Sequence, residues 1–147
     1  MSLVTEQHIA DAALAEEARI KQAYKKHKPA GYYSWFDPGN LFLVQEREKL
    51  LLQRLRQGGR EPLAGQRLLE IGCGSGHWLR KFITWGIKPA DVTGIDLRPD
   101  VLAHAAELCP PGVTLRCSNG SALDFPDESF DLVLVAGGDG TINEVIN

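Results

Sequence analysis

A glycine-rich turn that directly follows a short apolar run constrains this chain more than any other feature. Residues 67–71 have the pattern of a buried strand, residues 72–76 read Gly-Cys-Gly-Ser-Gly, and residues 77–85 have the pattern of a helix. Glycine lets the backbone turn sharply and approach a ligand closely, and a helix amino terminus offers free amide donors. The sequence therefore indicates a binding turn between a strand and a helix, although a tight turn without a ligand has the same pattern.

The glycine spacing separates this turn from dinucleotide-binding turns. A dinucleotide fingerprint has the form G-x-G-x-x-G. Here Gly76 comes one residue early, and His77 occupies the position of the third glycine. We therefore expect no bound pyrophosphate at this turn.

Short apolar strands and helical stretches alternate from residue 66 onward. This alternation predicts a parallel sheet with helical crossovers, which is an α/β doubly wound, Rossmann-like fold. The expected strands span 67–71, 92–95, 113–117 and 131–135, and the expected helices span 77–85 and 100–108.

Two helices are expected before this region, at residues 5–27 and 41–57. The second has a predicted buried stripe of leucines at positions 43, 50, 51 and 55. An aromatic segment at 32–36 and a turn signal at 37–40 lie between the two helices.

A carboxylate ends the second expected strand. Asp96 follows Gly94-Ile95, twenty residues beyond Gly76. A carboxylate at this place can accept hydrogen bonds from both ribose hydroxyls of a nucleoside. It could also cap the helix that begins near Pro99. Because the glycine turn and the acid occur in order, we favour ribose binding.

Composition and charge exclude several classes of function. The chain has 147 residues, which is enough for one core, and a net charge of −3 gives no general reason to bind nucleic acid or an anionic membrane. We expect no membrane span and a cytoplasmic location. The three cysteines (Cys73, Cys109 and Cys117) are too scattered for a zinc site, so no metal is expected.

Residues 30–135 resemble a class I S-adenosylmethionine-dependent methyltransferase of a small bacterial type. The resemblance rests on three runs: LLEIGCGSGHWLRKF, GIDLRPD and CPPGVTLRCSNGSALDFPDESFDLVLV. It implies S-adenosyl-L-methionine as cofactor and an unidentified small-molecule methyl acceptor. Catalytic residues stay unassigned, because methyl transfer needs mainly alignment.

The resemblance also implies the residues of the cofactor site. The glycine loop of the family cradles the methionine portion, the acid after the second strand holds the ribose, and residues after the third strand reach the adenine. Asn119 departs from the more common aspartate, but its amide oxygen can accept the same hydrogen bond. The implied residues are Glu70, Gly72, Cys73, Gly74 and Gly76 for methionine, Asp96 for ribose, and Leu97, Asn119 and Gly120 for adenine. The aromatic residues Tyr32, Tyr33, Trp35 and Phe36 resemble a lid over the cofactor, or they cover the core.

After Val135 the pattern changes. Residues 136–147 resemble the GGDGT motif of diacylglycerol and related lipid kinases, in which the glycine amides hold ATP phosphates and T-x-N-E-V-x-N opens the next helix. This resemblance indicates a fusion, with residues 1–60 as a helical lid segment, 61–135 as a cofactor-binding half-domain and 136–147 as the kinase-like segment. The loop could bind an anion weakly or serve only as a turn.

The family resemblance implies three further strands after the fourth, so we expect a truncated sheet in which the fourth strand is an exposed apolar edge. Such an edge pairs readily with another chain, so we expect a homodimer or aggregation unless the N-terminal helices cover it. Two functions stay open. The first is a truncated methyltransferase domain, which is either active or inactive. The second is a non-catalytic nucleotide-binding chimera that carries the GGDGT loop.

Overall fold

The computed structural model describes residues 34–118, 123, 125, 126, 129–136 and 142–146, together with Ala15, Ala18 and Gln22. The chain divides into two compact units. One contains residues 1–21 and 63–147, and the other contains residues 22–62. Of the helix expected at 5–27, only Ala15, Ala18 and Gln22 are among the described residues, and all three are helical.

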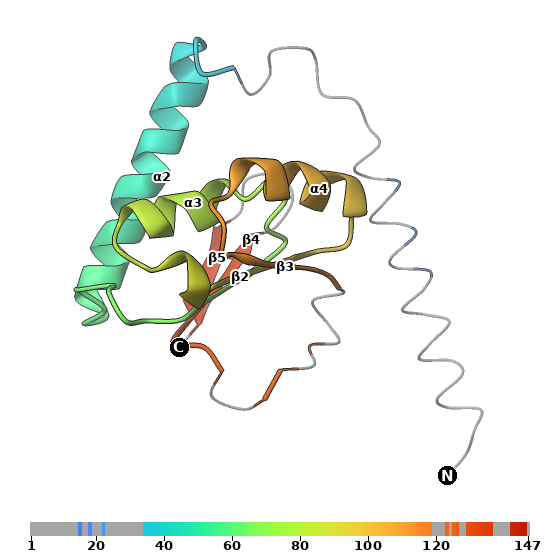
Figure 1. The fold of residues 1–147 in the computed structure, drawn as a ribbon. Coiled ribbons are helices and arrows are strands. Elements are labelled where there is room, and N and C mark those ends of the chain that lie inside the picture. Colours follow the sequence, from blue (N-terminus) through green and yellow to red (C-terminus); the bar gives the residue numbers. More distant parts are fainter. Residues whose placement is uncertain are drawn as a thin grey trace. The chain divides into compact units, whose positions relative to one another are not determined.

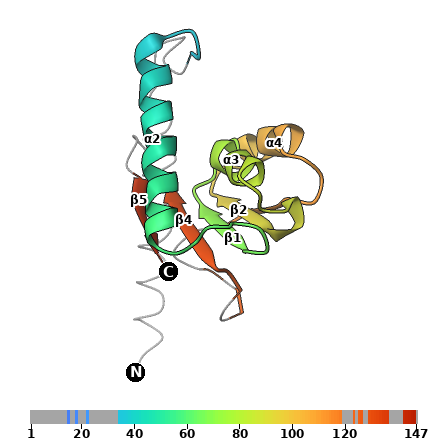
Figure 2. The ribbon, with the colours of Figure 1, turned by 90° about the vertical axis from the view of Figure 1, so that its left-hand side faces the viewer.

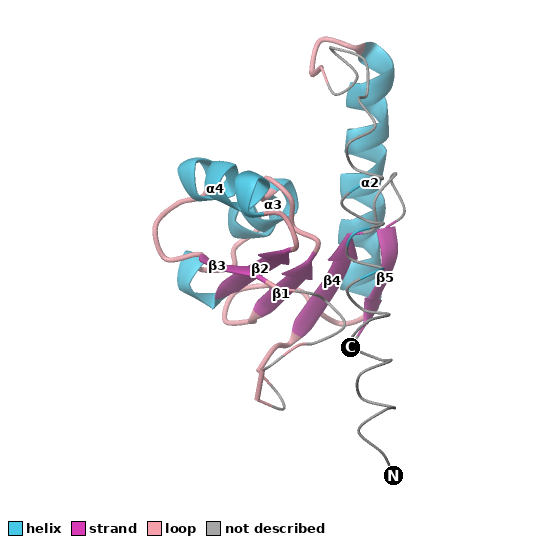
Figure 3. Cartoon of the chain, turned by 90° about the vertical axis from the view of Figure 1, so that its right-hand side faces the viewer, coloured by secondary structure: helices cyan, strands magenta, loops and turns pink. Residues whose placement is uncertain are grey.

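Five strands of the first unit form one sheet in the order β3-β2-β1-β4-β5 (Figures 1 and 3). Four of them are parallel, and the fifth runs antiparallel to β4. The α/β doubly wound class predicted from the sequence is therefore confirmed. The strands are β1 (Leu68–Ile71), β2 (Val92–Asp96), β3 (Thr114–Cys117), β4 (Leu132–Ala136) and β5 (Ile142–Ile146).

The crossovers from β1 to β2 and from β2 to β3 are helical, as predicted. α3 (His77–Thr84) and the short 3-10 helix η1 (Pro89–Asp91) join β1 to β2, and α4 (Pro99–Leu108) joins β2 to β3. α3 and α4 lie on the same face of the sheet (Figure 2). The bounds of α3, α4 and the four parallel strands lie within about a residue of the predicted ones, because the apolar periodicity changes sharply between strand and helix. The short η1 was not predicted.

The core of this unit forms between the sheet and the helices. The parallel register aligns Leu68 with Val92 on one side and with Leu132 on the other. All three side chains are at most 1% exposed, and so are Leu79 and Phe82 of α3. Each buried side chain of this size contributes about 1.5–3 kcal/mol relative to an exposed one.

Gly94 lets α3 approach β2 closely. A Cβ added at this position would lie 2.7 Å from Leu79 Cδ1 and 2.9 Å from Cys73 Sγ. Glu70 and Gly94 are partners in the register, so their side-chain positions share the face that α3 covers. The glycine therefore sets the spacing between the sheet and the helix that follows the glycine turn.

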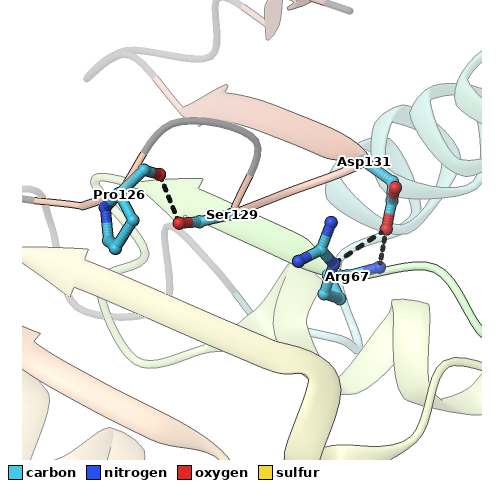
Figure 4. Close-up of polar contacts among 4 residues, drawn as sticks. All are labelled: Arg67, Pro126, Ser129 and Asp131. Atoms are coloured by element: carbon cyan, nitrogen blue, oxygen red, sulfur yellow. Dashed lines mark hydrogen bonds and ion pairs between the residues drawn. The ribbon is translucent and has the colours of Figure 1, made fainter.

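A clamp joins the starts of β1 and β4 (Figure 4). Asp131 Oδ2 accepts hydrogen bonds from the Arg67 backbone amide at 2.7 Å and from Arg67 Nε at 3.3 Å, while the Asp131 amide donates to the Arg67 carbonyl at 2.9 Å. The same figure shows the Ser129 hydroxyl donating to the Pro126 carbonyl. Asp131 therefore pairs with Arg67 and aligns the start of β4 with the start of β1.

β5 corrects two predictions about the end of the chain. The resemblance to lipid kinases implied a helix after the GGDGT motif, whereas residues 142–146 form a strand. β5 pairs with β4, with a register shift between Val133 and Val135, so the prediction that β4 would be an exposed edge is wrong. Residues 137–141, the GGDGT loop itself, lie outside the described residues.

The second unit contains α2 (Pro38–Gln57). The sequence placed a turn at residues 37–40, but the helix already begins there. Asp37 is the N-cap and accepts a hydrogen bond from the Asn40 amide at 2.7 Å, and Pro38 takes the first helical position. Of the predicted leucine stripe, Leu51 and Leu55 are buried, while Leu43 and Leu50 are more than half exposed. None of the helices in the described part of the chain has the length and apolar character needed to cross a bilayer.

We predict that Gly94→Ala lowers the free energy of unfolding by about 1–3 kcal/mol, because the new methyl group overpacks the contact between β2 and α3. Gly58→Ala is the control, since its Cβ would have no neighbour closer than 3.4 Å. Chemical denaturation of both variants measures the difference. Equal stability of the two variants would contradict this account of the β2–α3 spacing.

Candidate functional site

The glycine turn connects β1 to α3 through three residues in the left-handed backbone region. The φ angles are +77° at Gly72, +52° at Gly74 and +75° at Gly76. A side chain is strained in this region by about 1–2 kcal/mol, so the alternation of glycine with other residues follows the alternation of backbone conformation. This explains the G-x-G-x-G spacing without a dinucleotide.

The turn is fastened to the carboxyl end of β2. The amides of Gly72 and Cys73 both donate to the Ile95 carbonyl, at 2.8 and 2.9 Å. The next amide, that of Gly74, donates to Asp96 Oδ2 at 2.9 Å. Three consecutive amides are therefore used to hold the turn against the strand.

The two inner glycines have different surroundings. A Cβ at Gly76 would lie 2.7 Å from Cys109 Sγ, so this glycine is required for packing. A Cβ at Gly74 would have nothing within 4 Å, so the turn is open on that side. Next to the opening, the Ser75 amide has no hydrogen-bond acceptor within the described part of the chain. The turn thus offers an open surface and one available donor.

Asp96 lies beside this opening. Its Oδ2 accepts from the Gly74 amide, and its Oδ1 accepts from the Arg98 amide at 3.0 Å. The side chain does not cap α4, whose N-cap is Arg98 without a side-chain cap bond. A carboxylate has about four acceptor positions, so Asp96 keeps capacity for further donors. Its carbonyl accepts from the Ser118 amide at 3.1 Å, which links this end of β2 to β3.

Glu70 is buried on the α3 side of the sheet. The residue is 1% exposed, and its Oε2 has no hydrogen-bond partner among the described residues. Burial raises the pKa of Glu70 well above its ordinary value, a backbone hydrogen bond from Leu79 in the first turn of α3 opposes this shift, and the charge of Asp96 adds to it. The family resemblance grouped Glu70 with the residues that cradle the ligand. The structure places it on the face of the sheet that α3 covers, with a hydrogen bond from the Leu79 amide.

Cys73 is also held within the turn. The residue is 5% exposed, and burial is the main cause that raises the pKa of its thiol, followed by the charge of Glu70. A thiol with a raised pKa is a poor nucleophile, because the thiolate is the reactive form. The Cys73 side chain therefore has a packing role, and it lies against Gly94 of β2.

Leu97 and Cys117 lie where β2 and β3 end together. The register pairs Asp96 with Cys117, and the Cys117 thiol donates to the Leu97 carbonyl at 3.7 Å. Leu97 is half-buried and Cys117 is exposed. Leu97 thus follows Asp96 at the same edge of the sheet as the glycine turn.

The structure brings most of the predicted site residues together at the carboxyl ends of β1 and β2. These residues are Glu70, Gly72, Cys73, Gly74, Gly76, Asp96 and Leu97. Asn119 and Gly120 lie outside the described residues, as do Tyr32 and Tyr33 of the expected lid. Trp35 and Phe36 are exposed in the second unit. The described residues contain no cluster of three side chains suited to a metal ion.

Sequence reasoning missed Arg80. This residue of α3 reaches back to the turn, where its Nη1 donates to the Ser75 carbonyl at 2.7 Å. No motif signals this contact, because a basic residue in a helix ordinarily faces solvent. The His77 ring, at the start of α3, packs edge-on against Trp78.

Known proteins share this sequence pattern and this fold. The chain is 31% identical to the 2-methyl-6-phytyl-1,4-hydroquinone methyltransferase of Synechocystis over 80% of this chain and 37% of that protein. It is 35% identical to the phthiotriol/phenolphthiotriol dimycocerosates methyltransferase of Mycobacterium leprae over 49% of this chain and 27% of that protein. The chain thus spans well under half the length of these curated relatives.

A solved structure supports the fold independently. The PH0226 protein of Pyrococcus horikoshii superimposes with a TM-score of 0.53 at 20% identity, over 76% of this chain and 49% of that chain. At this identity the likeness concerns the fold alone.

The family assignment comes from the sequence profile of the methyltransferase domain, which matches residues 68–143. The match covers just over half of the chain, includes the turn, Asp96 and β4, and continues past Val135, where the resemblance was expected to end. It supports S-adenosyl-L-methionine as the cofactor that the sequence predicted. On this match, the chain belongs to the methyltransferase domain family.

Proposed function

We propose that this chain is the S-adenosyl-L-methionine-binding portion of a class I methyltransferase with a small-molecule acceptor. The observation that carries the proposal is the open side of Gly74, with the Ser75 amide and the Asp96 carboxylate beside it. The donor and the acceptor of hydrogen bonds suit two different parts of the cofactor, its methionine carboxylate and its ribose hydroxyls.

Each residue of the turn has a distinct part in this proposal. The Ser75 amide, at the amino terminus of α3, binds the carboxylate of the methionine portion. Asp96 accepts the ribose hydroxyls with its remaining acceptor positions while it holds the Gly74 amide. Leu97 and, from the family resemblance, Asn119 and Gly120 border the adenine. Glu70 and Cys73, which the family resemblance also assigns to the methionine portion, are buried next to the turn and support its backbone.

Bound S-adenosyl-L-methionine supplies a methyl group activated on a sulfonium sulfur. The contribution of this chain is to bind the cofactor and to orient it, which accelerates a displacement by bringing the reactants into alignment. No acid or base of the described residues is assigned a part in the chemical step.

The acceptor is proposed from the relatives. The Synechocystis protein is named for a phytyl-substituted hydroquinone, and the M. leprae protein is named for phthiotriol and phenolphthiotriol dimycocerosates. Their names support a lipid-like acceptor.

A homodimer also stays a prediction, although the argument from an exposed β4 no longer supports it.

The kinase-like alternative has less support. A phosphate-binding loop of that type works by placing amides at the start of a following helix. β5 follows residues 137–141 here, and it is a strand. We therefore keep binding of ATP as an outcome of the experiment and not as a second proposal.

Calorimetric titration with S-adenosylhomocysteine, and separately with ATP and Mg²⁺, tests the function. We expect binding of the first and none of the second. Asp96→Asn should weaken S-adenosylhomocysteine by about 1–3 kcal/mol because one hydroxyl acceptor is lost. Asp100→Asn, in the exposed first turn of α4, is the matched control. Unchanged affinity of the Asp96 variant would remove the ribose assignment, and binding of ATP alone would remove the proposed function.

A pair of glycine variants separates binding from packing. Gly74→Ala should reduce stability by about 1–2 kcal/mol through its backbone strain, and it should also weaken S-adenosylhomocysteine because the methyl group enters the open side of the turn. Gly76→Ala should be the less stable of the two, since its methyl group meets Cys109 Sγ. Thermal unfolding and calorimetry measure both effects. A Gly74→Ala protein that binds as the wild type does would disprove the location of the pocket.

The buried Glu70 predicts a dependence of stability on pH. Its pKa is raised in the folded chain, so its contribution to stability is complete below the ordinary value of 4.5 and is lost as the pH rises through the folded value. The glutamine of Glu70→Gln cannot ionise, so the stability of this variant does not fall with pH through this position. The melting temperature of Glu70→Gln relative to the wild type should therefore rise as the pH is increased above 4.5.

Glu107→Gln, which changes an exposed carboxyl group of α4, is the control for the pH series. Its melting temperature relative to the wild type should change far less over the same range. A difference in melting temperature between Glu70→Gln and the wild type that stays constant with pH would contradict a raised pKa of Glu70 in the folded chain.

A further inference from the structure

The peptide units of the glycine turn differ in how they are held. The Gly76 amide donates to the Cys73 carbonyl at 2.8 Å, and the Gly74 amide donates to Asp96. The Ser75 carbonyl accepts from Arg80 Nη1 at 2.7 Å. The peptide between Ser75 and Gly76 is therefore fixed at both of its polar ends, once by the main chain and once by a side chain.

Arg80 is attached to the turn in more than one way. Its own amide donates to the Gly76 carbonyl at 3.2 Å, and its Nη1 also lies 4.0 Å from Cys109 Sγ at the end of α4. Its charge lowers the pKa of the buried Glu70, which places the guanidinium in electrostatic reach of that carboxyl group. The side chain is half-buried, so a hydrogen bond from its charged group is worth more than an exposed one.

The peptide before this one carries the available donor. The Ser75 amide has no acceptor within the described residues, and it follows Gly74, which is open to a ligand. The Gly74–Ser75 peptide that carries this amide lies between two anchored groups. Asp96 holds the Gly74 amide on one side, and Cys73 and Arg80 hold the Ser75–Gly76 peptide on the other. Loss of the Arg80 contact would release the Ser75 carbonyl and so widen the range of backbone torsions open to Ser75 and its amide.

We propose that Arg80 is a positioning residue of the cofactor site: it holds the Ser75 carbonyl so that the Ser75 amide is preset for the carboxylate of the bound cofactor. The inference rests on the proposed function. Arg80 touches the turn and not the cofactor, so it acts through Ser75. A fixed donor loses less entropy on binding than a mobile one, which is the source of its effect on affinity.

The test compares Arg80→Gln and Arg80→Lys with the wild type, and Lys88→Gln is the control. The Lys88→Gln substitution removes the same charge as Arg80→Gln does. Lys88 is exposed, precedes η1 and makes no side-chain hydrogen bond that caps this helix. We expect Arg80→Gln to bind S-adenosylhomocysteine about tenfold more weakly, the loss of roughly one hydrogen bond to a charged group. Arg80→Lys should recover part of the affinity, and Lys88→Gln should bind as the wild type does.

Amide resonances distinguish positioning from a general loss of stability. In two-dimensional ¹H–¹⁵N spectra, Arg80→Gln should shift the Ser75 and Gly76 resonances and leave those of β3 and β4 in place. In the wild type, saturating S-adenosylhomocysteine should move the Ser75 resonance. Affinity of Arg80→Gln equal to that of the wild type, or a Ser75 resonance that does not respond to ligand, would overturn the inference.

The outcomes also separate this inference from the function on which it rests. Wild-type protein that fails to bind S-adenosylhomocysteine removes the proposed function itself. Wild-type protein that binds, with an Arg80→Gln variant of equal affinity, leaves the function in place and removes only the part assigned to Arg80. If Arg80→Gln does not fold, the wild-type Ser75 resonance and the affinity of Arg80→Lys still decide: the inference fails if ligand leaves that resonance unmoved or if Arg80→Lys binds no more weakly than Lys88→Gln.

Discussion

The attachment of the glycine turn to the end of β2 is the constraint on which the rest of this site depends. Three successive amides, from Gly72 to Gly74, are bound by the Ile95 carbonyl and the Asp96 carboxylate. Because these donors are already used, the surface that the turn presents is determined by the peptides that follow. The same bonds bring the acid of β2 next to the open glycine, so one interaction places both the Gly74 and the Asp96 parts of the candidate site.

This attachment requires close packing beneath it. α3 begins immediately after the turn, and its Leu79 and the Cys73 side chain meet β2 at Gly94, where no Cβ intervenes. Glu70 lies on the same face and is nearly inaccessible to solvent. The turn therefore rests on apolar contacts with one carboxyl group enclosed among them, and a charge at that place is disfavoured by its lack of solvation.

Much of this arrangement follows from local pattern. The strands and the two crossover helices are predictable because apolar residues change from short runs to helical spacing, and the turn is predictable because three left-handed residues require three glycines. Asp37-Pro38 was harder to interpret, since an N-cap followed by proline has the composition of a turn as well as of a helix start. Strand β5 was taken for a helix because its sequence resembles a motif from another fold, and its pairing with β4 depends on residues distant in sequence.

The contacts that finish the site could not be predicted in the same way. Arg80 meets the Ser75 carbonyl because the turn with its left-handed glycines leads directly into α3, one turn before Arg80. Likewise, the position of Glu70 on the α3 side follows from the register of β1 with β2, which a single sequence does not determine. Such contacts depend on three-dimensional geometry. From residue type alone, Arg80 would be an exposed basic residue and Glu70 a ligand-binding acid.

The unequal exposure of the thiols has a practical consequence. Cys73 is enclosed beneath the turn, while Cys117 is exposed and stands beside Asp96 in the strand register. A maleimide or a nitroxide reagent will therefore attach at Cys117 well before Cys73. Once the half-buried Cys109 is replaced, the probe would sit next to Asp96 in the strand register, where its spectrum can report ligand binding at the candidate site.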